Sequence, residues 1–387
     1  MPVRIAFPLI RSNWRGGFNY LLNLFDFLCE FESERIEPIL LSDPAATPEE
    51  LSEYQKRGLS TLSSDLYTRP RLKKTSLRNL VFGHDRLLAR DLTQHRMDVL
   101  FENALFFGRK FPVPTLAWFP DLQHQKLSQY FSKQEFWRRE LCFRAQAKHN
   151  RHVVVSSHDA KNDTLSFYPV LDENRIHVVR FATPLIESPS SDQIKATMQR
   201  YSIDSPYYFL PNRFWAHKNH MTVVEMVGKA KKKNKSITVI SCGNPSDSRN
   251  PHHFDRLMAR VKELQVEKEF RYIGQIPGAD LAPLTVNARA LINPSFFEGW
   301  STTVEEAKAL GVSMILSDLD VHREQCGEEA SYFKRDSSDD LLRVIEQFEE
   351  SNAADAVPNV DSLREKQTGR IRRFAKEFTD AALATKM

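Results

Sequence analysis

The sequence has few cysteines and no long apolar run, and these two gaps exclude several classes of protein. Its four cysteines (Cys29, Cys142, Cys242 and Cys326) are scattered, with no CxxC pair and no histidine cluster at metal-ligand spacing. This argues against a disulfide scaffold or a zinc site and fits a reducing cytosol. No apolar stretch approaches the ~20 residues that span a bilayer, and residues 1–30 lack the pattern of a signal peptide. We therefore expect a cytoplasmic protein that touches a membrane at most peripherally.

The sequence also lacks a strong charge imbalance and a dinucleotide-binding fingerprint. Its 54 basic and 50 acidic residues leave a net charge of +4, which by itself implies no partner. No G-x-G-x-x-G loop is present, and no pattern of a nucleic-acid-binding module appears. With 387 residues, 41% of them hydrophobic, the chain can build two domains, each with its own core.

Short apolar runs alternate with longer amphipathic ones, a pattern typical of parallel α/β domains. We predict strands at Val3–Pro8, Pro38–Leu41, Val99–Phe101, Thr115–Trp118, His152–Ser156, Ile176–Val179, Tyr207–Leu210, Ile237–Cys242, Phe270–Ile273, Ala288–Ile292 and Ser313–Ser317. The segment Thr183–Gln199 is rich in proline and serine, which marks a linker and the start of a new helix. The chain therefore divides into domains at 1–190 and 191–365, followed by a charged helix at 366–387.

The segment Asn293–Gly311 carries the strongest functional signal. It follows a predicted buried strand, and hydroxyl residues at 301–303 precede a short helical run that Gly311 closes. The N-terminus of a helix offers backbone N–H groups to an anion, usually a phosphate. Glu298 and Glu306 frame this position, and carboxylates accept hydrogen bonds from sugar hydroxyls. Alternatively, Glu306 belongs to a capping box and Glu298 is a solvated loop acid.

The two glutamates are separated by seven residues, with Gly299 after the first and Ala307 after the second. In this pattern the chain resembles the retaining glycosyltransferases of family 4, which have the GT-B fold: two Rossmann-like domains that face each other across a cleft. The resemblance implies that Glu298 and Gly299 lie at the donor sugar and that Glu306 holds the ribose. It also implies that the amides near Thr302 and Thr303 meet the phosphates and that Ser301 belongs to the same donor site. Ser301 and the two threonines depart from the family pattern, which leaves the donor's identity open.

Two further loops follow the first strand of each predicted domain. Arg213 and Lys218 bracket a turn after the strand at 207–210, and two cations there suit a diphosphate leaving group. Solvated loop residues are the alternative. We also expect Asn219 to cap the helix that follows. Gly16 and Gly17 permit a tight turn after the first strand, and the resemblance places such a pair near the donor phosphates.

Three other features have less specific readings. His124 and Asp121 follow the strand at 115–118. The resemblance places His124 near the reacting sugar, with Asp121 orienting it or receiving an acceptor hydroxyl. The alternative is that His124 has no function, because a lone loop histidine is often a bystander.

Asp318 and Asp320 form a DxD, but no other hard-ligand cluster supports a metal, so we expect metal-independent activity. Arg69–Arg90 holds seven basic residues with interleaved leucines, which predicts either a solvated helix or contact with an anionic bilayer or a pyrophosphate-linked acceptor.

Taken with the resemblance, these features predict a metal-independent, retaining hexosyltransferase without a cofactor. It would move a sugar from a nucleotide sugar to a glycan or lipid-linked acceptor in surface polysaccharide or glycoconjugate assembly. We expect no nucleic-acid partner. Two rivals stay open: a GT-B nucleotide-sugar epimerase, and a binding subunit that kept the fold and lost turnover.

Overall fold

The computed structural model describes residues 1–11, 15–351 and 359–386, and it divides the chain into two compact units. The N-terminal unit comprises Met1–Ala182 and the chain from Gly369 onward, and the C-terminal unit comprises Thr183–Thr368. The sequence prediction puts the first boundary at 190 and the second at 365. The segment 183–190 is an extended connection, and a helix begins directly after it at Ser191.

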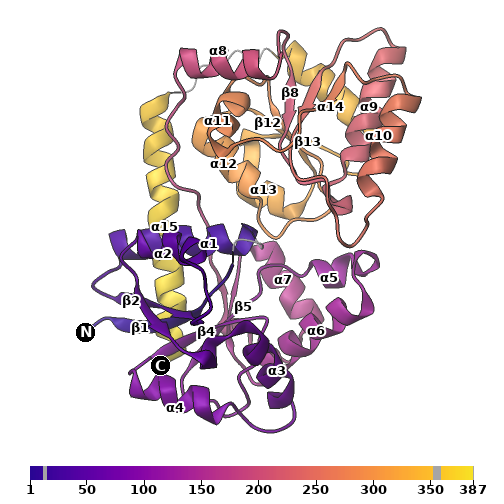
Figure 1. The fold of residues 1–387 in the computed structure, drawn as a ribbon. Helices are drawn as coiled ribbons and strands as arrows, with labels where there is room; N and C mark the ends of the chain where they lie inside the picture. Colours follow the sequence, from indigo (N-terminus) through magenta and orange to yellow (C-terminus); the bar gives the residue numbers. More distant parts are fainter. Residues whose placement is uncertain (12–14, 352–358, 387) are drawn as a thin grey trace. The chain divides into compact units, whose positions relative to one another are not determined.

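The N-terminal unit alternates strands and helices along its length (Figure 1). Its strands are β1 (Val3–Pro8), β2 (Ile36–Ser42), β3 (Ser60–Ser63), β4 (Val99–Asn103), β5 (Thr115–Trp118), β6 (His152–Val155) and β7 (Ile176–Val178). Its helices are α1 (Arg15–Phe31), α2 (Pro48–Gln55), α3 (Arg69–Asn79), α4 (Arg86–Gln94), α5 (Gln123–Lys126), α6 (Lys133–Lys148) and α7 (His158–Phe167), together with most of α15 (Val360–Lys386). Within the described residues the strands form one parallel sheet, in the order β3-β2-β1-β4-β5-β6-β7.

The last helix completes the core of the N-terminal unit. Phe378 of α15 lies 5.9 Å from Phe7 of β1 and 6.0 Å from Phe101 of β4, measured between ring centroids. The carboxylate of Glu377 accepts a hydrogen bond from the backbone N–H of Arg180 at 2.9 Å. Burial of apolar surface, to which these aromatic side chains contribute, is the main favourable term in folding. The C-terminal end of the chain is therefore an integral part of the first unit.

The C-terminal unit repeats the same plan with a smaller sheet. Its strands are β8 (Tyr208–Leu210), β9 (Val239–Ser241), β10 (Phe270–Tyr272), β11 (Leu291–Asn293), β12 (Met314–Ser317) and β13 (Ser331–Phe333). Its helices are α8 (Ser191–Arg200), α9 (His220–Lys232), α10 (His253–Glu263), α11 (Gly278–Val286), α12 (Thr302–Leu310), α13 (Asp320–Cys326) and α14 (Ser338–Glu350). In the part of this unit that the structure describes, the parallel order is β10-β9-β8-β11-β12-β13.

Each sheet has a point where the strand order reverses. It lies between β1 and β4 in the first unit and between β8 and β11 in the second. In open α/β sheets, ligands bind outside the carboxyl ends of the strands at this point. The loops after β8 and β11 in the second unit are those of Arg213–Lys218 and Glu298, so the fold brings the two strongest sequence motifs to one place.

Three local predictions are wrong. Gly16 and Gly17 lie inside the first turn of α1 instead of forming a tight turn, and residues 12–14 of the preceding loop lie outside the described residues. Asn219 precedes α9 but makes no side-chain cap bond, because its amide donates to the carbonyls of Pro294 at 3.0 Å and Arg335 at 2.8 Å. The basic segment Arg69–Arg90 is two helices, α3 and α4, because Gly83 turns the chain with a φ of 88°.

Candidate functional site

A buried ion pair joins the two loops at the reversal point of the C-terminal sheet. The Nζ atom of Lys218 lies 2.6 Å from Oε1 of Glu298, and the hydroxyl of Ser295 donates to the same oxygen at 2.6 Å. Burial raises the pKa of Glu298, but the positive charge of Lys218, the nearby His322 and these two hydrogen bonds lower it further, to about 2. Glu298 is therefore ionised at neutral pH. The ammonium group of Lys218 has three N–H donors; one bonds Glu298, and two can bond a ligand.

His322 completes this group, although the sequence analysis gave it no role. It lies on α13, fully buried, and its Nδ1 is 2.8 Å from the carbonyl oxygen of Ser317. A neutral imidazole that donates through Nδ1 presents Nε2 as an acceptor. No described group bonds that Nε2. The histidine is visible in the sequence only as part of the loop after β12.

Glu306 differs sharply from Glu298. It lies in α12, partly buried, and among the described residues no hydrogen bond or ion pair reaches its carboxylate. Burial alone raises its pKa to about 7. The capping-box alternative is excluded, because the N-cap is Ser301 and its side chain makes no cap bond. A carboxylate that is partly desolvated and unpartnered is unusual, and such groups concentrate at functional sites.

Neighbouring side chains fix the position of the N-terminus of α12, where backbone N–H groups of the first turn point out of the helix. The hydroxyl of Ser301 accepts a hydrogen bond from Nδ2 of Asn293 at 2.9 Å and lies 3.0 Å from the hydroxyl of Thr303. The backbone N–H of Ser301 donates to Gln325 at 3.3 Å. That N–H is thus already bonded within the protein. The N–H groups of Thr302 and Thr303 follow it in the first turn, where no intrahelical acceptor exists.

Arg213 is held by an aromatic side chain that the sequence analysis left without a function. Its guanidinium lies over the ring of Trp215, 4.7 Å from the centroid, and that of Arg249 lies 5.5 Å from the same ring. Such stacking stabilises a cation and limits its rotation. Trp215 therefore positions Arg213 in the loop between β8 and α9.

The predicted acceptor-side residues lie in the N-terminal unit. His124 is fully buried on α5, and its Nε2 lies 3.1 Å from Oε2 of Glu140. Glu140, missed in the sequence, also accepts hydrogen bonds from Tyr168 at 2.8 Å and Gln125 at 2.6 Å. Asp121 instead bonds Arg139 at 2.7 Å, so Glu140 and not Asp121 orients the imidazole. The role of His124 near a sugar stays a prediction.

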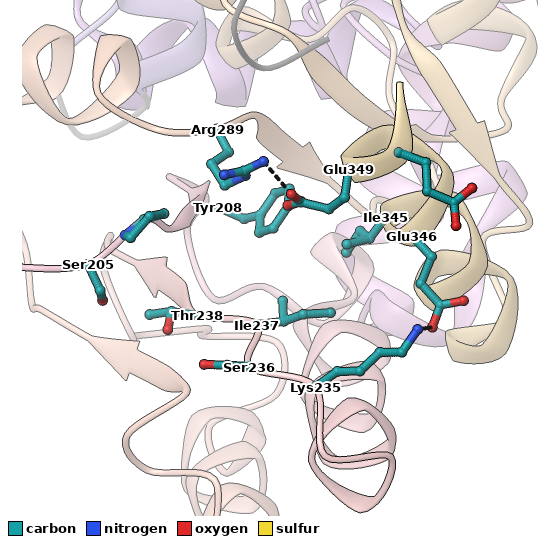
Figure 2. A pocket seen from close by; sticks show the side chains of 12 residues that line it. Ser205, Tyr208, Lys235, Ser236, Ile237, Thr238, Arg289, Ile345, Glu346 and Glu349 are labelled. Atoms are coloured by element: carbon teal, nitrogen blue, oxygen red, sulfur yellow. Dashed lines mark hydrogen bonds and ion pairs between the residues drawn. The ribbon is translucent and has the colours of Figure 1, made fainter. Parts of the chain in front are cut away.

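Two other features contain charged side chains that are already paired. The guanidinium of Arg323 contacts Asp318 at 2.5 and 2.9 Å, and no group of three or more potential metal ligands occurs among the residues that the structure describes. A hollow of about 480 Å³ lies beside the starts of β8 and β9, at the opposite end of these strands from Lys218. Figure 2 shows two charged pairs in its lining, Arg289 with Glu349 and Lys235 with Glu346.

The comparisons with known proteins agree with this architecture. Solved structures of similar fold include a glycosyltransferase from Rickettsia africae ESF-5, with a TM-score of 0.66, 15% identity, and coverage of 99% of this chain and 96% of that one. Anabaena Alr3699/HepE in complex with UDP has a TM-score of 0.67 and 14% identity, covering 99% and 98%. Sucrose-phosphate synthase from Thermosynechococcus elongatus has a TM-score of 0.64 and 15% identity, covering 99% and 94%.

These likenesses establish the fold, which is the predicted GT-B class with two parallel-sheet α/β domains. No curated protein sequence matches the chain. Residues 194–367, almost the whole C-terminal unit, match the family model described as glycosyl transferases group 1. No helix in the described part of the chain is long and apolar enough to cross a membrane.

Proposed function

We propose that the protein is a metal-independent, retaining glycosyltransferase that moves a sugar from a nucleoside-diphosphate sugar to a hydroxyl of a glycan or lipid-linked acceptor. The observation that carries this proposal is that a hydrogen-bond acceptor and several hydrogen-bond donors lie around α12. Glu306 offers an unpartnered carboxylate, and Lys218 with the first-turn amides offers donors. Ribose hydroxyls and a diphosphate fit these two chemistries. Anabaena Alr3699/HepE has been solved in complex with UDP and with UDP-glucose, which supports the same class of donor.

In the proposed reaction, cationic and N–H groups of the site stabilise the diphosphate as it leaves the sugar. The bond between the sugar's anomeric carbon and the diphosphate oxygen breaks, and a bond to the acceptor oxygen forms on the same face. The acceptor proton passes to the departing phosphate oxygen. Negative charge grows on the diphosphate, where Lys218, Arg213 and the N-terminus of α12 stabilise it. Glu298, ionised and fixed by Lys218 and Ser295, accepts hydrogen bonds from the sugar's hydroxyls.

Incubation of the protein with a panel of nucleotide sugars and candidate acceptors tests the proposal. We expect transfer of the sugar with release of the nucleoside diphosphate. An isomerised donor without acceptor would identify an epimerase instead. Binding of donors without any chemistry, on every acceptor offered, would identify a binding subunit. A thermal-shift screen of nucleoside diphosphates first selects the donor, since a ligand that binds the native state raises its stability.

A second part of the proposal concerns how the acceptor is reached. Leu77, Val81 and Phe82, in and just after α3, are exposed, and so are Trp137 and Leu141 of α6. The two helices pack together, since Oγ of Ser76 lies 3.7 Å from Sγ of Cys142. Phe82 is 75% exposed and Trp137 is 52% exposed, which is unusual for large apolar side chains.

Exposed cations border these apolar side chains, and this combination fits an anionic bilayer. Lys73, Lys74 and Arg78 are exposed on α3, and each is worth about 1 kcal/mol near an anionic surface. We expect binding to anionic but not neutral liposomes, weakened by salt and by changing these three residues to Gln. A matched variant of Lys195, Lys232 and Lys233, exposed in the C-terminal unit, should bind as the wild type does. Equal loss in both variants, or equal binding to both liposome types, would contradict membrane contact.

A further inference from the structure

Buried hydrogen bonds in the C-terminal unit connect the carboxylate of Glu298 with the first turn of α12. Asn293, the last residue of β11, lies between these two parts and is fully buried. The loop 294–300, which carries Glu298, begins directly after this asparagine and ends at Ser301, the N-cap of α12. The side-chain amide of Asn293 contacts both ends of this loop.

At the start of the loop, the amide of Asn293 contacts Ser295. The hydroxyl of Ser295 lies 2.7 Å from Oδ1 of Asn293 and 2.6 Å from Oε1 of Glu298. Because this hydroxyl has one hydrogen and both neighbours are acceptors, the hydrogen is shared between an amide oxygen and a carboxylate oxygen. All three side chains are buried, so the position of the carboxylate depends on partners within the protein.

At the end of the loop, the same amide contacts the hydroxyls that begin α12. Nδ2 of Asn293 donates to Oγ of Ser301 at 2.9 Å and, at a longer 3.4 Å, to Oγ1 of Thr303. The backbone N–H of Ser295 donates to Oδ1 of the asparagine at 3.4 Å, which fixes this orientation of the amide. Ser301 is buried and accepts from the amide, so its own hydrogen is directed to Oγ1 of Thr303, 3.0 Å away. The hydroxyl hydrogen of the partly buried Thr303 is then left for a ligand.

A second buried amide holds the start of α12 from α13 and serves as a comparison. Nε2 of Gln325 donates to the backbone carbonyl of Ser301 at 2.9 Å, and its Oε1 accepts from the backbone N–H of the same residue at 3.3 Å. Nε2 also lies 2.8 Å from Oε1 of Glu305. These bonds fix the backbone of Ser301 to α13, whereas those of Asn293 extend through Ser295 to the carboxylate of Glu298.

We propose that Asn293 is a positioning residue that sets the distance between the carboxylate that meets the donor sugar and the helix turn that meets the donor phosphates. The inference rests on the proposed function, in which Glu298 binds the sugar and the N-terminus of α12 binds the diphosphate. In a nucleoside-diphosphate sugar these two parts are joined directly, so their separation is fixed by covalent chemistry. A site that holds a matching separation loses less freedom on binding and keeps the sugar near the geometry of reaction.

Inorganic pyrophosphate tests the part of the inference that concerns α12, because it needs neither a sugar nor an acceptor. In calorimetric titrations its affinity should fall about tenfold in Asn293→Ala and in Ser301→Ala, and no further in the double variant, because both changes break the same bond. The control is Asn79→Ala, which removes another fully buried amide, one that donates to the carbonyl of Phe107 at 3.2 Å in the N-terminal unit. This control should bind pyrophosphate as the wild type does. Equal loss in Asn79→Ala, or wild-type affinity in Asn293→Ala, would overturn the inference.

Steady-state kinetics with the donor and acceptor found for the wild type test the part that concerns Glu298. Ser295→Ala should lower kcat about tenfold with little change in KM, because the sugar is misplaced while the phosphates bind normally. Gln325→Ala should raise KM with little change in kcat, because it loosens α12 alone. Asn293→Ala should do both, and should lower kcat no further in a protein that already has Ser295→Ala. A change in KM alone for Asn293→Ala, or a further fall of kcat in that double variant, would overturn the inference.

Two outcomes separate this inference from the proposed function. Sugar transfer by the wild type with unchanged kinetics in Asn293→Ala would reject the positioning role and leave the proposed function intact. Neither pyrophosphate binding nor transfer by the wild type would reject the donor site itself, and the inference with it. If Asn293→Ala does not fold, the single variants Ser295→Ala and Ser301→Ala decide. A lower kcat in the first and weaker pyrophosphate binding in the second are expected, and wild-type values in both would overturn the inference.

Discussion

The two sheet edges of this protein hold their candidate functional groups in different states of pairing. At the C-terminal edge, Lys218 contacts Glu298 and the guanidinium of Arg213 lies over the ring of Trp215, while no described group bonds the carboxylate of Glu306. At the N-terminal edge, His124 is paired with Glu140 and Asp121 with Arg139. An edge that combines hydrogen-bond donors with an unpartnered carboxylate suits a ligand with both phosphates and hydroxyls. The comparison thus supports the proposed nucleotide-sugar site in the C-terminal unit.

Among these variants, removal of the Lys218 side chain should have the largest effect on turnover. In Lys218→Ala, kcat should fall by about 10²- to 10³-fold and by more than KM rises, because the lysine stabilises charge that develops in the transition state. Glu298 would also stay buried without its counter-ion, so unfolding should become easier by about 3 kcal/mol. Steady-state kinetics and urea denaturation measure the two effects.

Two companion variants separate catalysis from stability. Arg213→Ala should lower kcat with a smaller loss of stability, because the groups that keep Glu298 ionised are Lys218, His322 and Ser295. Lys229→Ala, on the exposed surface of α9, is the control and should behave as the wild type. A pure rise of KM in both Lys218→Ala and Arg213→Ala would show that the two cations serve ground-state binding alone.

The contributions of Glu306 and Glu298 to the stability of the fold should change with pH in opposite directions. Because the pKa of Glu306 is raised to about 7, the folded protein holds a proton that the unfolded chain has lost, and stability falls as pH rises from about 4.5 to 7. Glu306→Gln should therefore raise Tm at pH 8 and change it little at pH 4. The pKa of Glu298 is lowered to about 2, so its contribution is present above about 4.5 and is lost as pH falls toward 2.

Thermal melts of wild type, Glu306→Gln and Glu298→Gln across this range test the contrast. The gain in Tm for Glu306→Gln should appear as pH rises through the interval from 4.5 to 7. Glu298→Gln should lose stability at neutral pH and approach the wild type under acid conditions. Identical pH profiles for the two variants would show that the carboxyl groups do not differ as the structure indicates.

Chelation should have the smallest effect. Asp318 is bound by Arg323, and the proposed charge stabilisation comes from side chains and amides. We therefore expect unchanged turnover in EDTA, measured as released nucleoside diphosphate. Complete loss of activity, with recovery on adding manganese or magnesium, would show that the DxD binds a metal and that the charge balance of the C-terminal edge is incomplete without it.

The sequence predicts the buried parts of this fold better than its edges. The strands at Val3–Pro8 and Thr115–Trp118 match β1 and β5 in full, because continuous apolar runs mark strands covered on both faces. The strands β3 (Ser60–Ser63) and β13 (Ser331–Phe333) escaped prediction. Both are short edge strands with polar residues, and edge strands need no apolar run.

The sequence also predicts only part of the candidate site. Glu298, Glu306 and Lys218 lie in short motifs that spacing can reveal. His322 and Trp215 could be quoted from the sequence but not given a role, since their partners come from other loops. Asn219 fits a capping position by sequence, yet its amide serves two distant carbonyls.

Calorimetric titration of wild type, Glu306→Gln and Glu298→Gln with a nucleoside diphosphate and with its sugar conjugate tests the central claim most directly. The account predicts that Glu306→Gln binds both ligands at least about tenfold more weakly, because the ribose loses a charged acceptor worth about 1.5–3 kcal/mol. Glu298→Gln should bind the nucleoside diphosphate normally and lose turnover with the conjugate, because the sugar is misplaced. Wild-type binding and turnover in both variants would contradict the assignment of this edge to a nucleotide sugar.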